Sequence, residues 1–250
     1  MDVNALESEK DKKYWTKRFQ QEISILKEAQ THPSVCRLLE TFKINGKTVL
    51  VLENIEGGSI KKWLKLNAPV SLEQKIAFLS QILKVYAFFH KKGILHGDIH
   101  RSNILIANDL STEVSTQKIK IIDFDMSYHQ PLRKDELVIE GGVEGYLPPE
   151  NISNDYFDTV KKCANFRSEV YQLGVIAYTI FYEKMPFEAA KWKDLAKMIR
   201  ESPPELGLFT ENTEGGIDSF LSQCLAKNPK KRFISAIQMN DYWQQWLKKC

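Results

Sequence analysis

A chain of 250 residues, 43% hydrophobic and 27% charged, is long enough for one domain with a sizeable core and is too apolar to be disordered. Its formal net charge of +3 excludes the strongly basic balance of a nucleic-acid-wrapping protein, so we expect no nucleic-acid partner. Four scattered cysteines without a C-x-x-C pair predict neither a zinc site nor a disulfide framework, which favours reduced thiols and a cytoplasmic location.

The N-terminal part of the chain predicts one helix and one hairpin. Apolar residues at helical spacing place the helix at residues 15–30, and the basic stretch Lys10 to Arg18 is expected to form a solvated helix face. Two short apolar runs follow, Cys36 to Leu39 and Thr48 to Glu53. Asn45-Gly46 lies between them and is typical of a tight hairpin turn.

Helical periodicity dominates after Gly57-Gly58, where we place the boundary between a small lobe (1–56) and a large one (57–250) of a single domain. The fold class is therefore α+β. A long amphipathic helix is predicted from Leu72 to Tyr86, and strands at about 103–106 and 118–122 flank a polar loop at 107–117. Further helices are expected at 166–183, 188–201, 215–226 and 235–248.

No stretch approaches the roughly 20 apolar residues that a membrane-spanning helix needs. The polar N-terminus also lacks the apolar region of a secretory signal. We therefore expect no membrane segment and no export.

Oxygen-bearing side chains gather in two short segments that precede or follow predicted strands. Asp98 and Asn103 lie five residues apart in HGDIHRSNILI, and Asp123 and Asp125 lie in KIKIIDFD. Carboxylate and amide oxygens are the ligands that Mg²⁺ prefers, with water and phosphate completing the shell. Asx chemistry in a turn could also explain Asp98 and Asn103, but the downstream Asp123 favours a site.

These segments resemble the protein kinase superfamily, whose signatures are H-R-D-L-x-x-x-N, D-F-G and A-P-E. The corresponding stretches here read HGDIHRSN, DFD and PPE, and SEVYQLGV and CLAKNPKKR resemble later segments of the same family. The resemblance implies a bilobal kinase-like fold that binds ATP with Mg²⁺, or Mn²⁺. It also implies that Asp98 accepts the substrate proton, that Asn103 and Asp123 hold the metal, and that His96 supports the loop.

The resemblance extends upstream of this loop. FQQEISILKEAQTHP is similar to the helix whose glutamate, here Glu22, pairs with the catalytic lysine. VLVLENIEGGSI looks like the last strand and hinge of the small lobe. It implies that Leu52 is the gatekeeper, that the Glu53 and Ile55 backbones meet the adenine, and that Leu105 also lines the nucleotide site.

A structural ion pair is implied as well. The glutamate of A-P-E corresponds to Glu150, and the arginine that pairs with it in the family corresponds to Arg232. Glu169 takes the place of an aspartate that usually opens the preceding helix motif. We interpret the pair of Glu150 and Arg232 as structural.

Four features depart from the family pattern. No glycine-rich loop or V-A-I-K lysine precedes the helix of Glu22, so the chain seen here starts near the end of that strand and Glu22 lacks its usual partner. Gly97 replaces the arginine of H-R-D. His100 replaces a lysine usual in Ser/Thr kinases, and Val143 replaces the threonine that contacts that lysine. D-F-G reads D-F-D, with Asp125 in the glycine position.

Three functions remain open from the sequence. The first is a weak Ser/Thr protein kinase with catalytic residues Asp98, His96, His100 and Glu22. The second is a pseudokinase that acts as a scaffold, and the third is a small-molecule phosphotransferase, because HGDIH and DFD also resemble aminoglycoside and choline kinases. The expected partners are a protein substrate or regulatory protein, with a possible partner segment that completes the small lobe. His32, His90 and His129 are expected to be surface or capping residues.

Overall fold

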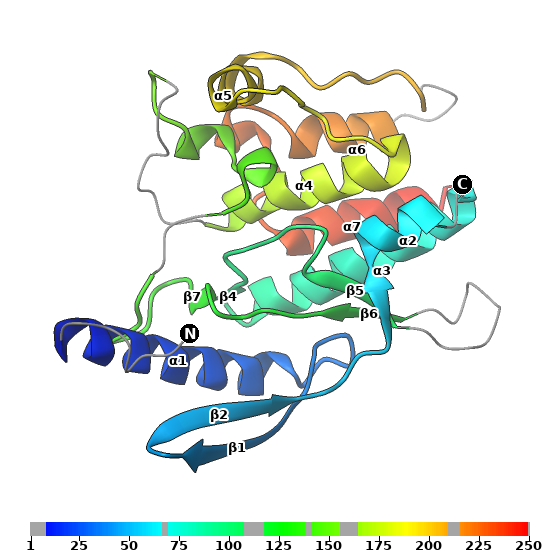
Figure 1. Ribbon diagram of the computed structural model, residues 1–250. Coiled ribbons are helices and arrows are strands. Elements are labelled where there is room, and N and C mark those ends of the chain that lie inside the picture. Colours follow the sequence, from blue (N-terminus) through cyan, green and yellow to red (C-terminus); the bar gives the residue numbers. More distant parts are fainter. Residues whose placement is uncertain are drawn as a thin grey trace.

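The computed structural model describes residues 9–66, 70–107, 118–138, 142–155, 165–209 and 216–249. A small part built on one helix and a hairpin lies against a larger, mainly helical part (Figure 1). The helices are α1 (Glu9–Ala29), α2 (Ile60–Leu66), α3 (Leu72–Lys91), α4 (Phe166–Tyr182), α5 (Trp192–Glu201), α6 (Ile217–Cys224) and α7 (Ala236–Leu247). The strands are β1 (Leu38–Ile44), β2 (Lys47–Leu52), β3 (Gly57–Ser59), β4 (Ile94–Leu95), β5 (Ile104–Ala107), β6 (Lys118–Ile121) and β7 (Tyr128–His129).

The predicted helix and hairpin of the small part are present. β1 and β2 pair antiparallel through a turn in which Asn45 and Gly46 have φ values of 49° and 78°. Both positive values belong to a type I′ turn, whose twist matches the strands. α1 begins earlier than the periodicity predicted, because its first two turns are polar and carry no apolar stripe.

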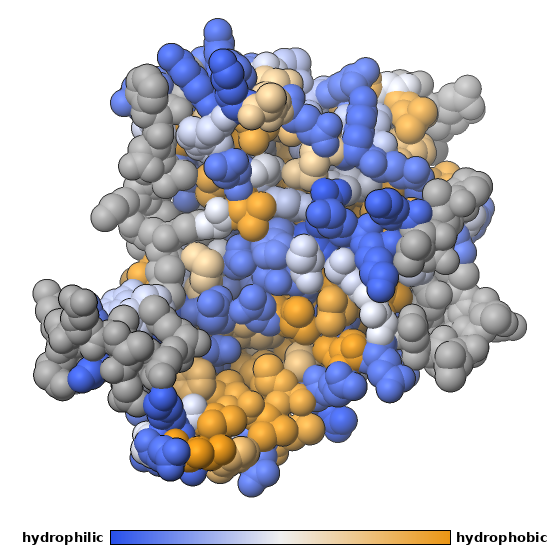
Figure 2. Space-filling model, in the orientation of Figure 1, coloured by the Kyte–Doolittle hydropathy of each residue, from blue (hydrophilic) through white to orange (hydrophobic). Residues whose placement is uncertain are grey.

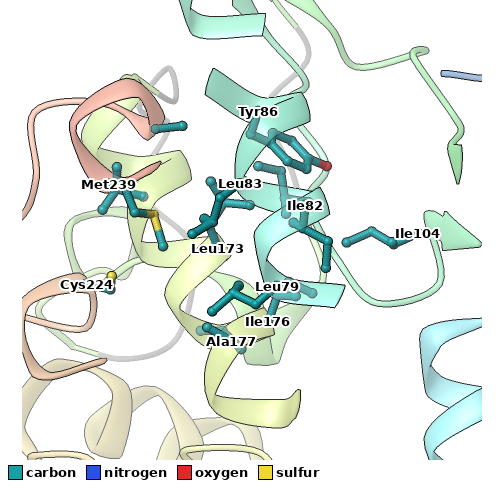
Figure 3. Packing of buried hydrophobic residues seen from close by; sticks show 14 of the residues in the cluster. Leu79, Ile82, Leu83, Tyr86, Ile104, Leu173, Ile176, Ala177, Cys224 and Met239 are labelled. Carbon is teal, nitrogen blue, oxygen red and sulfur yellow. The ribbon is translucent and has the colours of Figure 1, made fainter. Parts of the chain in front are cut away.

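The core lies between α3, α4 and α7 in the larger part. Ser71 caps α3 in a capping box with Gln74, and Asn165 caps α4 by accepting from the amides of Arg167 and Ser168. Side chains of α3 and α4 face each other in Figure 3, where Leu79 and Leu83 meet Leu173, Ile176 and Ala177, while Ile82 faces Ile104 of β5. All seven are fully buried, so this layer fixes how the functional loops are held.

Short elements were missing from the sequence prediction. β3 is the sequence Gly-Gly-Ser, which has low strand propensity, yet it pairs antiparallel with β5 and completes the sheet β3-β5-β6. β4 and β7 pair over two residues each. α2 is a single short helix whose Trp63 packs edge-on against Phe78 of α3.

The long predicted elements agree with the structure within a few residues. α3, α4, α6 and α7 cover the predicted helices, whereas α5 starts at Trp192 and not at residue 188. Residues 108–117 of the predicted polar loop lie outside the described residues. Within the described ranges, no helix combines the length and the apolar character that crossing a membrane requires.

Candidate active site

The segment from His96 to Asn103 connects β4 with β5 and forms the centre of the site. His96 is fully buried, packs against Phe124 with 5.0 Å between ring centroids, and lies 3.0 Å from the Ile122 carbonyl through Nε2. Burial lowers the pKa of His96. Its Nδ1 accepts from the Asp98 amide at 3.4 Å, so His96 ties the loop to the segment before Asp123.

Asp98 is held by two side chains from its own loop. The Nε2 atom of His100 lies 3.2 Å from Oδ2 of Asp98, and the Asn103 amide donates to the same oxygen at 3.2 Å. Nδ1 of His100 accepts from the Ser102 amide, which places the ring proton on Nε2 and makes His100 the donor. Burial acts to raise the pKa of Asp98, but these hydrogen bonds outweigh it and lower the pKa.

The loop backbone is anchored to the core through Glu169. Oε1 of this fully buried residue accepts from the Gly97 amide at 2.9 Å, and Oε2 lies 2.8 Å from Nε2 of His90. Nδ1 of His90 in turn accepts from the Ala236 amide at the start of α7, so the ring proton lies on Nε2. His90 is therefore a buried capping residue, so of the two expected roles, surface or capping, the second holds.

Gly97 has a structural reason to be glycine. Its φ is 83°, and a Cβ atom there would collide with the carbonyl oxygen of Met126. The position therefore combines a left-handed backbone with a close approach of the two functional segments. An arginine cannot occupy it without displacing one of them.

Carboxylates gather at the end of the segment that follows β6. Asp123 adopts a φ of 68°, which is uncommon outside glycine. Burial, with the charges of Asp125 and Asp123, raises the pKa of Glu22 on α1 to about 7. Burial, with the charge of Asp123, raises the pKa of Asp125 to about 6. Among described residues, Arg18 is the one cation that opposes the rise at Glu22.

α1 is fastened to the segment after Asp123 by polar side chains. Arg18 donates to the carbonyl of Asp125 and, at 2.9 Å, to that of Ser127. Gln21 donates to the carbonyls of Ser127 and Leu137, both at 2.9 Å. The Leu137 amide donates back to Gln21 at 2.7 Å. Arg18 is only 2% exposed, so the prediction of a solvated basic face from Lys10 to Arg18 was wrong at this residue.

A second set of contacts joins α1 to the same segment. His129 on β7 lies between Glu136, next to its Nδ1, and Glu28 of α1, 3.3 Å from its Nε2. Arg133 donates to both oxygens of Glu28. Burial acts to raise the pKa of Glu28 and Glu136, but their bonds to Arg133 and His129 lower it. His129 is 3% exposed, which corrects the expected surface position.

A cavity of about 440 Å³ lies between the two parts of the chain. It includes all four residues predicted to bind the nucleotide and also two acidic residues of the predicted site. Leu26 and Cys36 were not predicted, because neither belongs to a recognisable motif. The cavity is lined by Glu22, Leu26, Cys36, Leu52, Glu53, Asn54, Ile55, Leu105, Ile122, Asp123 and Phe124.

The predicted pair of Glu150 and Arg232 is present. Arg232 donates to both carboxylate oxygens of Glu150 at 2.9 and 2.7 Å, and its side chain is fully buried. It also donates to the carbonyls of Ala226, Arg167 and Lys227. Because these bonds satisfy the guanidinium within the protein, the pair ties the end of the 142–151 segment to the larger part.

The cavity and its surroundings fit a nucleotide with a divalent cation. Leucine and isoleucine side chains line one part, as a planar apolar base requires, and Asp123 and Glu22 bring negative charge. Burial and the charges of Asp125 and Asp123 raise the pKa of Glu22, and the nearby Arg18 only partly offsets this rise. Among the described residues, no group of three or more His, Cys, Asp and Glu side chains is arranged to hold a metal ion alone. Ligands from phosphate and from Asn103 would have to contribute.

Comparisons with known proteins agree with the site. The model of the protein kinase domain family matches residues 3–244. The chain is 30% identical over 237 residues to the serine/threonine-protein kinase cds1 of Schizosaccharomyces pombe, covering 91% of this chain and 48% of that protein. It is 27% identical to Aurora/IPL1-related protein kinase 2 of Caenorhabditis elegans, covering 86% and 65% respectively. It is 26% identical to the serine/threonine-protein kinase PknB of Mycobacterium leprae, covering 84% and 33%. The chain thus spans from a third to two thirds of these relatives' lengths.

Proposed function

Because this chain belongs to the protein kinase superfamily, we propose that it transfers the γ-phosphoryl group of ATP to Ser or Thr hydroxyls of proteins, with Mg²⁺ or Mn²⁺. Family membership and the relatives support protein phosphorylation in general, and the finer statement is our own. The observation that carries it is the placement of Asp98, hydrogen-bonded to Asn103, on the loop beside a cavity that Asp123 also lines.

In this proposal Asp98 accepts the proton of the substrate hydroxyl. Its lowered pKa keeps it ionised at neutral pH, and the donors His100 and Asn103 hold its carboxylate in place. The apolar part of the cavity, with Leu52 and Leu105, would bind the adenine. Asn103 and Asp123 would hold the cation, which neutralises phosphate charge when bound.

The surroundings of Glu22 are consistent with slow phosphoryl transfer. The charge of Arg18 acts to lower the pKa of Glu22, but burial and the charges of Asp125 and Asp123 outweigh it. A lysine that pairs with this glutamate would also bind the α- and β-phosphates. Without it, positioning of the phosphates depends on the cation and on backbone contacts. We therefore expect slow turnover.

The unbalanced charge at Glu22 also favours a second candidate, a pseudokinase that binds nucleotide without turnover. The third candidate, a small-molecule phosphotransferase, retains the support of HGDIH and DFD. The pair of Glu150 and Arg232 holds a segment that resembles those of protein kinases, so we rank it last.

We also propose that a partner segment adds a strand beside β2. β2 pairs only with β1 among the described residues, so its other edge has no neighbouring strand there. Figure 2 shows hydrophobic surface gathered where Figure 1 places this hairpin. Leu39, Phe42, Ile44 and Leu52 are 57%, 38%, 51% and 43% exposed. Such a strand would cover apolar surface and could bring a cation to Glu22.

A cytoplasmic location is likewise a proposal. Cys36 and Cys224 are buried and unpaired, which a reducing compartment permits.

Labelled ATP tests the first proposal. The natural chain with Mg²⁺ or Mn²⁺ should label a mixture of Ser/Thr proteins or itself, and Asp98→Asn should reduce the rate about 10²–10⁴-fold. Asp241→Asn, an exposed aspartate on α7, is the matched control and should retain the rate. Label incorporation that survives Asp98→Asn would contradict the assigned role.

Thermal unfolding with nucleotide separates the candidates. Nucleotide at about 100 times its dissociation constant should stabilise a binding-competent chain by roughly 2.7 kcal/mol. Stabilisation without labelling would favour the pseudokinase. No stabilisation by ATP with either cation would contradict the kinase and favour a pseudokinase that acts as a scaffold.

A further inference from the structure

A group of four cations lies near the proposed base and defines what we name the basic rim: Lys61, Lys62 and Lys65 of α2, and Arg101 of the catalytic loop. The three lysines are exposed and Arg101 is half-buried. The sequence of α2, IKKWLKL, contains no acidic residue. Its Ile60 is 1% exposed and its Trp63 packs on α3, so the helix buries its apolar side and presents its lysines to solvent.

The strand register places α2 close to Asp98. Ser59, the residue before α2, pairs with Leu105, which follows Asn103 by two residues. The Asn103 amide lies 3.2 Å from the Asp98 carboxylate. Because paired strand residues are about 5 Å apart, the start of α2 lies within roughly 15 Å of Asp98. An extended peptide covers that distance in about four or five residues.

Arg101 lies on the other side of the loop. It follows Asp98 by three residues, and its charge opposes the rise that burial causes in the pKa of Tyr146. Tyr146 belongs to the 3₁₀ helix η3 (Glu144–Tyr146), and its ring centroid is 6.1 Å from that of His100, the residue that contacts Asp98. The charge of Arg101 therefore acts on Tyr146, in the segment that precedes Glu150.

The charges of the basic rim lack acidic partners among the described residues. None of its four residues forms an ion pair with a residue that the structure describes. Exposed carboxylates beside this region are Glu56, before β3, Glu144 in η3, and Asp123 and Asp125 of the proposed site. The charged side chains of α2 itself are all positive. Figure 2 shows strongly hydrophilic surface where Figure 1 places α2.

We propose that the basic rim selects acidic substrates, in which Asp, Glu or a phosphorylated residue lies within about five residues of the acceptor hydroxyl. This inference rests on the proposed function, because it assigns the substrate class of the same site. Single exposed charges contribute little, but several of one sign act together on an extended ligand. The selection weakens as salt rises, since the charges are exposed.

Three peptides test the inference. Each carries one serine acceptor, flanked by aspartate, alanine or lysine, and is phosphorylated by the natural chain at low salt. We expect kcat/KM for the acidic peptide to exceed that for the lysine peptide by about tenfold, and this ratio to fall with added salt. Equal values, or a preference for the lysine peptide, would overturn the inference.

Charge reversal locates the effect. Lys61→Glu with Lys65→Glu should abolish the preference for the acidic peptide. The matched control, Lys43→Glu with Lys248→Glu, makes the same change of charge at exposed positions on β1 and after α7, and it should keep the preference. Equal losses in both double variants would show a general effect of net charge and would overturn the role of the basic rim.

A binding measurement separates this inference from the proposed function. Fluorescent peptides with alanine in place of the serine are titrated with the natural chain and with both double variants. Binding of the acidic peptide that depends on Lys61 and Lys65, without phosphorylation of any peptide, supports the basic rim and contradicts the kinase activity. Phosphorylation without any preference for charge supports the activity and contradicts the basic rim. A phosphoserine-flanked peptide that exceeds the aspartate peptide identifies primed substrates as the source of the negative charge.

Discussion

Glu22→Gln should stabilise the free protein, although it removes a residue of the proposed site. Burial and the charges of Asp125 and Asp123 raise the pKa of Glu22 from an ordinary 4.5 to about 7. A group whose folded pKa is raised contributes stability below its unfolded pKa, and this is lost as pH rises through the folded value. Ionised Glu22 is therefore unfavourable at neutral pH, and a neutral amide avoids that cost.

The expected gain follows from the size of the shift. A change from 4.5 to about 7 corresponds to about 3 kcal/mol for a fully buried group. Because Glu22 is half-buried, solvent screening reduces this to about 1–2 kcal/mol. Most of this gain in the free energy of unfolding should appear between about pH 5 and about pH 8, because the Glu22 carboxyl group ionises in the folded protein within this range.

Urea unfolding at about pH 5 and about pH 8 measures this gain. The free energy of unfolding of Glu22→Gln should exceed that of the natural chain at the higher pH and nearly match it at the lower. Glu40→Gln, an exposed glutamate on β1, provides the matched control and should show no such difference. A variant less stable than the natural chain at about pH 8 would refute the unbalanced negative charge.

Three other changes follow from contacts in the larger part and around α1. Arg232→Met leaves the Glu150 carboxylate partly buried without its partner and should cost about 3–5 kcal/mol in urea unfolding. Gly97→Ala should lower the melting temperature, because alanine at a φ of 83° is strained and collides with a backbone carbonyl; an unchanged value would show that the loop moves freely. The pKa of Glu28 is lowered first by Arg133 and then by His129, so these contacts stabilise the fold above the ordinary value of 4.5, and this stability is lost as pH falls through the lowered value. Glu28→Gln should therefore make the free energy of unfolding less sensitive to pH below about 5. An unchanged pH dependence in this range would contradict these contacts.

The sequence predicted elements whose signals are local or strongly periodic. The turn at Asn45-Gly46 needs positive φ at both residues, and this dipeptide adopts it readily. α3 and α4 have long apolar stripes, which only a buried helix face explains. The cluster of Asp98 and Asn103 was also found, because the family motif places both on one loop, and the structure brings them within hydrogen-bond distance.

Other features depend on contacts between distant segments, which one sequence does not display. Arg18 looks like the end of a basic surface stretch, and it is buried because carbonyls of residues 125 and 127 accept its hydrogen bonds. His90 and His129 read as ordinary histidines, since Glu169 lies 79 residues from His90 and Glu28 lies 101 residues from His129 along the chain. β3 has no strand propensity and forms because β5 offers it an edge.

The contacts of α1 separate two roles that a lysine partner for Glu22 would combine. Such a lysine would fix the position of the helix and balance the charge of the glutamate. Here Arg18 and Gln21 already fix α1 against the 125–137 segment, so Glu22 reaches the cavity without a lysine. The positive charge that such a lysine would add beside Glu22 is still missing, and the pKa of Glu22 is raised to about 7. A cation brought by a partner strand beside β2 should therefore raise the rate mainly by binding phosphate, with little change in the position of α1.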